Sequence, residues 1–566
     1  MEEATVTKLG IIPIAYQFLE ELEIAALFDT LLETGKEDIS HGRVASVLLL
    51  NLLDGSSPLY KLSGWLSAYS DGLGEFAKEA NKYNDKRLGS TLDALYSSNR
   101  HELLAKLSAR AIRVHGLDTD IMHNDTTTVT FTGVYERSQA EGSEVKLAHG
   151  YNKDHRPDYK QIVFGLNVSA DGYVPVMAQL YSGNQSDGKT HPVNWQALRE
   201  FLGKADFIYI ADSKLCSTEN LVTIAGAGGK FISVLPATRR EAKQYYQELR
   251  QLNQAALPQH WPLAYEVENS RKPGSSIVYR IKQGKATKEG FRLLWVWSSA
   301  KALQDAGRRN KAIAKAETQL QDILPKLNRY HLKTKEQIQA YLEKHLGKGK
   351  QFFDIRLEAQ TQRLKKQLGK GRPGPNTRWK EVPLTTYQLH YSLRQEVIQA
   401  DAKTDGVFPL ITNTEVEAAQ VLRHYKNQPY LEKRFNGLKS VLEVAPVFLK
   451  KPERIEAMLL LYIIALMLIA LIERRIRKNM EDQKVEALPI LPQGMKTRKP
   501  TWSNIRFCFN SVIMLSILLG HGVATQHVVK GLGKQQLQVL DLLQIPAEKY
   551  QAMTPTWWKG TSIRGR

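Results

Sequence analysis

The stretch DIMHNDTTTVTFTGVY, residues 120–135, decides the fold, because helical periodicity gives way there to strand-like alternation of Thr and Val. Before it, residues 9–113 place apolar side chains at intervals of three and four, which predicts an all-helical N-terminal module. After it, YKQIVFGLNVSADGYVPVMAQLYSG (residues 159–183) holds two β-rich runs around the turn sequence ADG at 170–172. That pattern predicts a β-hairpin.

Beyond the hairpin, helical and strand patterns alternate. The segments are the helix HPVNWQALREFLG (191–203), the strand FIYIAD (207–212), the helix STENLVTIAGA (217–227) and the strand KFISVLP (230–236). This order predicts an α/β fold with a mixed sheet, in which three antiparallel strands come first and parallel crossovers follow, with helices on both faces.

A long segment separates this sheet from the next helix of the core, and it is far too long for a loop in a compact domain. We therefore expect a large inserted domain. It contains an exposed basic loop, RLKKQLGKGRPGPNTRWK (363–380), and a β-hairpin over residues 387–413. The predicted domains are the N-terminal module 1–115, the first part of the core 116–240, the insert 241–414, the second part of the core 415–480 and a C-terminal region 481–566.

Composition and charge restrict the class of partner and the compartment. The chain has 566 residues and a formal net charge of +20, which favours nucleic acid as the partner. Two isolated cysteines and an acidic N-terminus without a long apolar stretch fit a reducing cytoplasm. The apolar run Met458–Ile472 has 15 residues, fewer than the roughly 20 of a bilayer span, so we expect a buried core helix and no membrane.

Acidic residues at strand ends indicate the chemistry. Asp125 lies in the first strand and Asp212 directly follows the fourth, so the two carboxylates meet if those strands are neighbours. Glu432, on a later helix, is the candidate for a third ligand in an oxygen cage for Mg2+, with Mn2+ as a possible substitute. Two such ions would support phosphodiester cleavage and strand transfer. Taken singly, each Asp is more often a turn former or a helix cap.

The helix of Glu432 carries a second pattern. Tyr425, Glu432 and Lys439 are seven residues apart, close to two helical turns, and Gln428 lies between the first two. One face of a single helix would then present a carboxylate flanked by a phenol and an ammonium. A solvated surface stripe with a charge pair is the alternative.

Taken together, these motifs resemble the DDE transposases of bacterial insertion sequences, in the branch with the Tyr-x2-Arg-x3-Glu-x6-Lys (YREK) signature. NDTTTVTF resembles the first-Asp motif, YIADSKLCSTENL the second-Asp motif, and YKNQPYLEKRFNGLK the signature itself. GYNKDHRPDYKQIVFGL is similar to a linker of the same family. The signature arginine is replaced by Gln428, whose amide cannot grip a phosphate as a guanidinium does.

The resemblance implies a ribonuclease H-like core with Asp125, Asp212 and Glu432 as catalytic metal ligands. It also implies a transposase that binds the ends of a mobile element through its N-terminal module, cleaves them and joins them to target DNA. Double-stranded DNA is then the partner, a homodimer assembles on it, and the protein is cytoplasmic and nucleoid-associated. The expected DNA contacts are Tyr425, Gln428, Lys439, Lys153, Arg156 and Lys160.

Three other classes stay open on the sequence. A ribonuclease H-like nuclease or domesticated DNA-processing protein would cut DNA without transposing. A non-catalytic DNA-binding protein would carry the acids for structure alone. A membrane-associated protein is disfavoured by the short apolar run.

Overall fold

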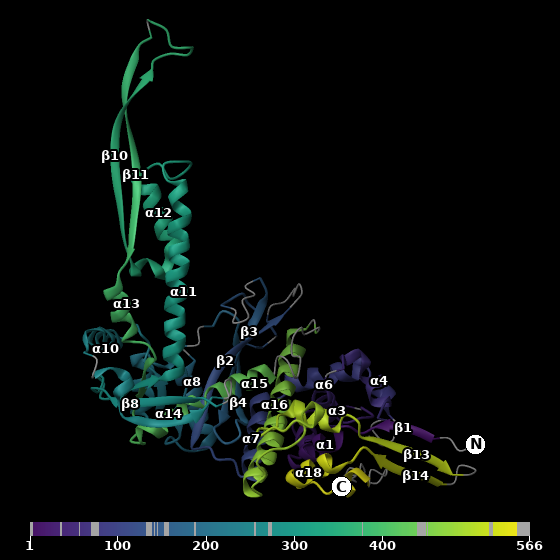
Figure 1. Cartoon of the computed structure of the whole chain (residues 1–566). Coiled ribbons are helices and arrows are strands. Elements are labelled where there is room, and N and C mark those ends of the chain that lie inside the picture. The colour runs from purple at the N-terminus through teal and green to yellow at the C-terminus, as the bar shows by residue number, and fades with distance from the viewer. Residues whose placement is uncertain are drawn as a thin grey trace. The chain divides into compact units, whose positions relative to one another are not determined.

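The computed structural model divides into two compact units. Unit 1 comprises Met1–Ser233 and Arg423–Arg566, and unit 2 comprises Val234–Leu422. The structure describes residues 4–551 except 34, 36, 56, 70–78, 132–138, 141, 144, 152–157, 186, 187, 189, 254, 255, 270–273, 376, 438–448, 450 and 520–523. Figure 1 shows the elements of each unit, which are taken separately below.

The N-terminal part of unit 1 is mainly helical. Its helices are α1 (Ile12–Glu21), α2 (Ile24–Leu31), α3 (His41–Asp54), α4 (Leu62–Ser67), α6 (Asp85–Ser97) and α7 (Arg100–His115). The helical pattern predicted over residues 9–113 is matched by these helices, and β1 (Ala4–Lys8) precedes that range and pairs antiparallel with β13 (Ile513–Leu519). The β-branched run Thr5–Thr7 favours a strand, but its partner lies some five hundred residues downstream, beyond the reach of local periodicity.

The C-terminal part of unit 1 completes this small sheet. There β13 also pairs with β14 (Ala524–Lys530), so the strand order is β1-β13-β14. The accompanying helices are α17 (Trp502–Phe509), α18 (Lys534–Leu542) and α19 (Glu548–Gln551). Trp502 and Phe509 are buried in the same hydrophobic cluster as the N-terminal helices. The first and last segments of the described chain therefore share one core.

The centre of that core is α16 (Pro452–Asp482), a helix of 31 residues. Among the described residues it is the one helix long and apolar enough to cross a membrane, and its most apolar window is completely buried inside the protein. The expected buried core helix is therefore confirmed. The charges taken as its limits lie inside it: Glu456 is ion-paired to Arg100, and Arg474 to Asp171. A helix apolar on all sides must be covered on all sides, and α1, α3, α6, α7, α17 and α18 do this.

The larger sheet of unit 1 follows the predicted order. Its strands are β2 (Ile121–Phe131), β3 (Lys160–Ser169), β4 (Pro175–Ser182), β5 (Ile208–Ile210) and β6 (Lys230–Val234), arranged as β4-β3-β2-β5-β6. Pairing is antiparallel for β2 with β3 and for β3 with β4, and parallel for β2 with β5 and for β5 with β6. Helices α8 (His191–Leu202) and α9 (Thr218–Gly226) form the crossovers. The predicted mixed α/β sheet is confirmed.

The turn between β3 and β4 is fixed by a glycine and an arginine. Gly172 has φ of +77°, and a Cβ at this position would lie 2.7 Å from the Cβ of Arg474. Arg474 donates to both carboxylate oxygens of Asp171, at 2.7 and 2.6 Å. The left-handed backbone and the close approach of α16 both require glycine at the turn.

Four strands of unit 2 are hydrogen-bonded in the order β12-β9-β8-β7. Its strands are β7 (Leu263–Glu268), β8 (Ser276–Gln283), β9 (Arg292–Ser298) and β12 (Val407–Thr412). Helix α10 (Arg240–Gln251) precedes them, and α11 (Ser299–Ile323) and α12 (Lys335–Leu346) follow β9. Tyr245 of α10 stacks on Trp295 of β9 with ring centroids 3.8 Å apart.

Two expectations for the insert need correction. The hairpin predicted over residues 387–413 does not form, because α13 (Gln395–Ala402) separates the two strands and each pairs with another partner. The basic loop 363–380 is largely the outer end of a different hairpin, made by β10 (Phe353–Gln367) and β11 (Trp379–Leu393). Strand alternation was read correctly, but strand pairing depends on contacts distant in sequence.

Arg434 joins the second part of the core to the β3–β4 turn. Its guanidinium donates to the carbonyl oxygens of Tyr173 at 3.0 Å and Gly172 at 2.7 Å, and to the carboxylate of Glu473 at 2.7 Å. Both charged side chains are less than a tenth exposed. An ion pair this buried contributes little net stability when intact, but removal of Arg434 takes one of two cations from the buried carboxylate of Glu473 and leaves it with Arg477 at 3.3 Å.

We therefore expect Arg434→Met to lower the free energy of unfolding by about 3–5 kcal/mol, the range for one lost partner of a buried pair. Lys478→Met, on an exposed position of the same α16 surface as Arg477, is the control and should change stability by no more than about 0.5 kcal/mol. Urea unfolding followed by circular dichroism measures both. Equal midpoints for the two variants would show that the pair does not hold this joint.

Candidate functional site

The strand register places Asp125 and Asp212 side by side. In the parallel pairing of β2 and β5, His123 lies opposite Ile210. Asp125 follows His123 by two residues within β2, and Asp212 follows Ile210 by two residues, just after the end of β5. Adjacent strands are about 4.8 Å apart. Asp125 therefore lies inside β2 at the level of the carboxyl end of β5, where Asp212 follows, and sites in open α/β sheets form at such strand ends.

Local hydrogen bonds orient both carboxylates. Oδ1 of Asp125 accepts from the backbone N–H of Thr126 at 2.7 Å, and Oδ1 of Asp212 accepts from the N–H of Lys214 at 3.0 Å. The carbonyl of Asp212 accepts from the Ser233 hydroxyl of β6 at 2.7 Å. The side chain of Asp212 is 42% exposed and Asp125 is partly exposed, so solvent reaches the pair.

A chain of buried polar side chains supports Asp212 from behind. His191 lies with Nε2 3.9 Å from Oδ1 of Asp212 and with Nδ1 3.2 Å from the hydroxyl of Tyr209. Asn194 donates to the same hydroxyl at 2.9 Å and bonds to Asn167 of β3. Burial, with smaller contributions from Asp212 and Asp125, raises the pKa of Tyr209 well above its usual value, so the phenol stays protonated. Sequence reasoning missed this network, because its members lie on three separate elements.

An uncharged histidine, His123, lies next to Asp125 on the same face of β2. His123 precedes Asp125 by two residues on β2, so both side chains share one face of the strand. It is completely buried, and neither ring nitrogen has a hydrogen-bond partner within the described chain. Burial and the nearby His424 lower the pKa of His123 to about 3, so the ring carries no charge at neutral pH. His123 therefore places no positive charge next to Asp125.

The expected single helix of Tyr425 and Glu432 is two helices. Helix α14 (Ala418–Lys426) ends after Tyr425, and α15 (Pro429–Asn436) begins with a proline and carries Glu432. Pro429 cannot supply the N–H that a continuous helix needs, so the chain makes a tight turn at Asn427 and Gln428. The seven-residue stripe is therefore broken between the phenol and the carboxylate, which the proline in the sequence could have indicated.

Tyr425 nevertheless responds to all three acids. Burial, and after it the charges of Asp212, Cys216, Glu432 and Asp125 in that order, raise the pKa of its phenol to about 12. Helix α15 packs against β2, which brings the Glu432 segment to the strand that carries Asp125. The structure therefore gathers Tyr425 and the three carboxylates in one region.

The three carboxylates are not yet a metal cage. Within the part of the chain that the structure describes, no three His, Cys, Asp or Glu side chains lie close enough to hold one ion. Asp125 and Asp212 fit a hard divalent cation, since they are adjacent, oxygen-bearing and accessible. Glu432 is exposed on α15, so its carboxylate is free of core packing and has to come closer to complete the set.

The other predicted DNA contacts are placed unequally. Gln428 is 8% exposed, so its amide does not face a ligand in this conformation. Lys160 pairs with Phe131, six residues along β2 from Asp125 and hence about 20 Å away at 3.3 Å per residue. Lys439, Lys153 and Arg156 lie outside the described residues.

A cationic cluster beside Glu432 was missed. Nζ of Lys499 donates to the Tyr430 hydroxyl at 2.8 Å, and Nζ of Lys433 lies 4.6 Å from the centroid of the same ring. Tyr173 stacks on Tyr430 at 4.6 Å. The hydrogen bond from Lys499 lowers the pKa of Tyr430 against the effect of burial. The run MKTRK at 495–499 was the available signal, but it reads as a polar linker unless its contact with α15 is known.

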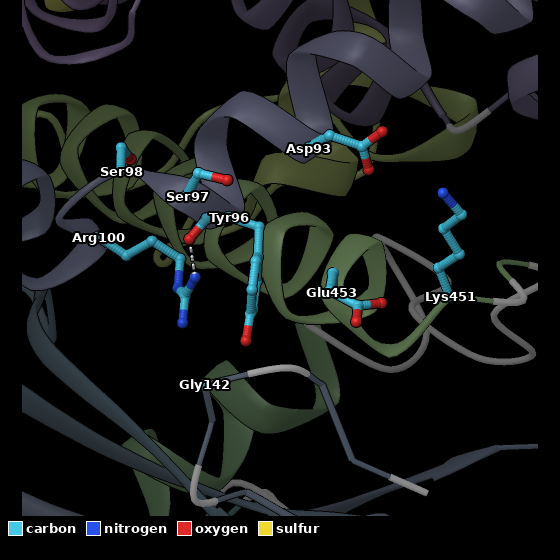
Figure 2. A pocket seen from close by; sticks show the side chains of 8 residues that line it. All are labelled: Asp93, Tyr96, Ser97, Ser98, Arg100, Gly142, Lys451 and Glu453. Atoms are coloured by element: carbon cyan, nitrogen blue, oxygen red, sulfur yellow. Dashed lines mark hydrogen bonds between the residues drawn. The ribbon is translucent and has the colours of Figure 1, made fainter. Parts of the chain in front are cut away.

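A cavity lined by other residues lies elsewhere in unit 1. It has a volume of about 630 Å³ and lies between α6, the start of α7 and the start of α16. Figure 2 shows Tyr96 standing between Arg100 and Glu453, with the guanidinium bonded to the Tyr96 carbonyl. Its charges are compensated inside the protein, since Arg100 pairs with Glu456 and Asp93 with Arg454. None of the predicted site residues lines this cavity.

Comparison with known proteins adds little to this geometry. Residues 4–109 match the family model described as "Domain of unknown function (DUF4277)". No curated protein matches. Among solved structures, the cryo-EM structure of a piggyBac transposase synaptic complex with hairpin DNA matches with 9% identity and a TM-score of 0.37, covering 99% of this chain and 90% of that one. A TM-score this low carries no conclusion about fold or chemistry.

Titration of Tyr425 tests the gathering of the acids without any reaction. We expect Asp125→Asn combined with Asp212→Asn to lower the pKa of Tyr425 from about 12, because the phenolate then meets two fewer negative charges. NMR of ζ-13C-labelled tyrosine, assigned with Tyr425→Phe, measures it. Tyr245, whose pKa is raised to about 12 by burial and Glu248, is the control and should not move.

The raised pKa of Tyr425 determines the direction in which folding stability changes with pH. Because the folded pKa of about 12 lies above the unfolded value of about 10, the folded state holds this proton more tightly. The contribution of this proton to stability is complete below about pH 10 and is lost as pH rises towards 12.

In the NMR titration, a pKa of Tyr425 that the double aspartate substitution leaves unchanged would place the two aspartates away from the phenol.

Proposed function

We propose that this protein is a DDE-type DNA transposase that binds the ends of a mobile element and catalyses metal-dependent cleavage and strand transfer. The observation that carries the proposal is the register of β2 and β5, in which Asp125 and Asp212 each come two residues after the last paired residues, His123 and Ile210. The YREK-type motifs, the net charge of +20 and the electrostatic proximity of Glu432 to Tyr425 support it. On this proposal the sheet of unit 1 is a ribonuclease H-like core.

Asp125 and Asp212 would hold the divalent cations, Mg2+ or Mn2+, and Glu432 would complete the ligand set. When bound, two such ions activate the attacking oxygen and stabilise the leaving oxygen of a phosphodiester. His191, Tyr209 and Asn194 would position Asp212 through the buried network and touch neither metal nor DNA. Tyr425 stays protonated at neutral pH, so it would donate a hydrogen bond to phosphate without adding charge.

Lys433 and Lys499 would extend the phosphate-binding surface next to Glu432. Tyr430 holds both ammonium groups, one by a hydrogen bond and one over its ring. Gln428 is buried, so cations from these neighbouring positions would replace the signature arginine in gripping DNA. Lys439, Lys153, Arg156 and Lys160 remain predicted contacts. The N-terminal module would bind the element ends, and two copies would assemble on them.

Metal binding and cleavage should fail together in the acidic variants. We expect Asp125→Asn, Asp212→Asn and Glu432→Gln each to reduce Mg2+-dependent cleavage of an element-end duplex by more than about hundredfold, beyond the loss typical of outer partners of a metal ligand. Glu219→Gln, an isosteric change on an exposed position of α9, is the control and should cut like the parent.

Calorimetry with Mn2+ gives the readout that does not depend on activity, and a DNA-binding assay checks that the variants remain folded. The two aspartate variants should lose Mn2+ affinity while they still bind DNA. Cleavage by Glu432→Gln at the parental rate would remove Glu432 from the ligand set. Cleavage without joining to target DNA would favour the nuclease alternative.

A further inference from the structure

Strands β10 and β11 form an isolated two-stranded ribbon in unit 2. They pair antiparallel over 15 residues each, from Phe353 opposite Leu393 to Gln367 opposite Trp379. At about 3.4 Å per residue the ribbon is roughly 50 Å long. Figure 1 shows it running beside α12 and then well beyond the end of the helices of this unit.

Only the base of the ribbon is held by the fold. Phe353 and Leu389 are buried in a cluster with α11 and α12. Asn328 bonds the backbone of Tyr387 twice, donating to its carbonyl at 2.9 Å and accepting from its N–H at 2.7 Å. Every residue of Glu358–Lys366 and of Trp379–Leu384 is exposed. A two-stranded ribbon in water is marginally stable by itself, so the outer half lacks the packing that usually supports such a structure.

The two faces of the outer half differ in charge. Residues directly opposite each other share a face, so one face carries the pairs Leu364–Val382 and Lys366–Lys380. We call this the lysine face. The other, the glutamate face, carries Arg363 and Lys365 together with Glu381, and Arg363 pairs with Glu381 at 3.6 Å.

The positive charges of the two opposed lysines on the lysine face are not neutralised by any described residue of the protein. Like charges directly opposite each other destabilise a strand pair, and Lys366 and Lys380 make no ion pair with any described residue. Arg378 follows at the next position, where its carbonyl accepts from the N–H of Leu368 at 2.8 Å. Leu364 and Val382 are 47% and 37% exposed on the same face. No acidic residue occurs between 363 and 380.

We propose that the lysine face of the β10–β11 ribbon binds in the major groove of duplex DNA. Lys366, Lys380 and Arg378 contact backbone phosphates, which supply the negative charge that the opposed lysines lack. Leu364 and Val382 face the base edges, where thymine methyl groups offer apolar contact. The inference shares with the proposed function only the choice of DNA as partner, and it holds whether or not the protein cleaves.

Groove dimensions decide the type of nucleic acid. The B-form major groove is about 12 Å wide and admits a two-stranded ribbon, whereas the A-form major groove of RNA is deep and too narrow for side chains to read. Double-stranded DNA is therefore favoured over double-stranded RNA. Seven basic residues between 363 and 380 provide the charge for either, so shape makes the distinction.

The test compares two charge-matched variants of the full-length chain. Lys366→Gln with Lys380→Gln removes two cations from the lysine face, and Arg363→Gln with Lys365→Gln removes two from the glutamate face. Fluorescence anisotropy with a labelled random DNA duplex gives affinity over a range of salt concentrations. For the lysine face we expect the slope of log K against log salt to fall by about 1.8, or 0.9 for each lost phosphate contact. For the glutamate-face variant we expect a decrease in this slope of less than half that size.

Two further measurements separate the outcomes. The lysine-face variant should melt no lower than the parent, because the substitution relieves like-charge repulsion. An unlabelled RNA duplex of equal length should displace the DNA poorly. Equal slopes for both variants, or equal competition by RNA, would overturn the groove contact. Asp125 is not part of the ribbon, so Asp125→Asn should keep the parental salt slope. Undiminished cleavage by Asp125→Asn would count against the proposed function and leave the ribbon proposal unaffected.

Discussion

The architecture of unit 1 depends on the need to cover α16. A helix with apolar side chains on every side is stable in water only when other segments surround it, and here those segments come from both ends of the chain. Several charges near its ends are matched by a distant partner, including Arg100 for Glu456 and Glu21 for Arg475. The N-terminal helices therefore share one core with the segment that carries Glu432. Deletion of the N-terminal residues up to about 115 would expose the apolar surface of α16. It would therefore disturb the shared core and would not remove one function selectively.

Sequence patterns were sufficient where neighbouring residues determine the structure. The order of β2 to β6 and the crossovers α8 and α9 follow from local alternation and periodicity, and the β2–β5 register then placed Asp125 beside Asp212. They were insufficient where pairing joins distant segments, as for β1 with β13. The hairpin expected over residues 387–413 failed for the same reason, since both strand patterns were right and both partners were wrong.

The acidic residues differ in how firmly the backbone holds them. Asp125 and Asp212 are fixed by a parallel strand pair and by hydrogen bonds to neighbouring N–H groups. Glu432 belongs to an eight-residue helix that begins at Pro429, and its position depends on the packing of α15. The sequence predicted all three acids as metal ligands, but it could not distinguish two that are held beside paired strands from one on a short helix. That difference comes from the proline and from the burial of Gln428.

Unit 2 is inserted into unit 1 through two covalent connections, and both lie close to the acidic residues. The chain leaves unit 1 after Ser233, whose hydroxyl is bonded to the carbonyl of Asp212, and it returns at Arg423, two residues before Tyr425. Any shortening or replacement of the insert therefore has to preserve both junctions, because one follows the strand beside Asp212 and the other lies on the helix that carries Tyr425.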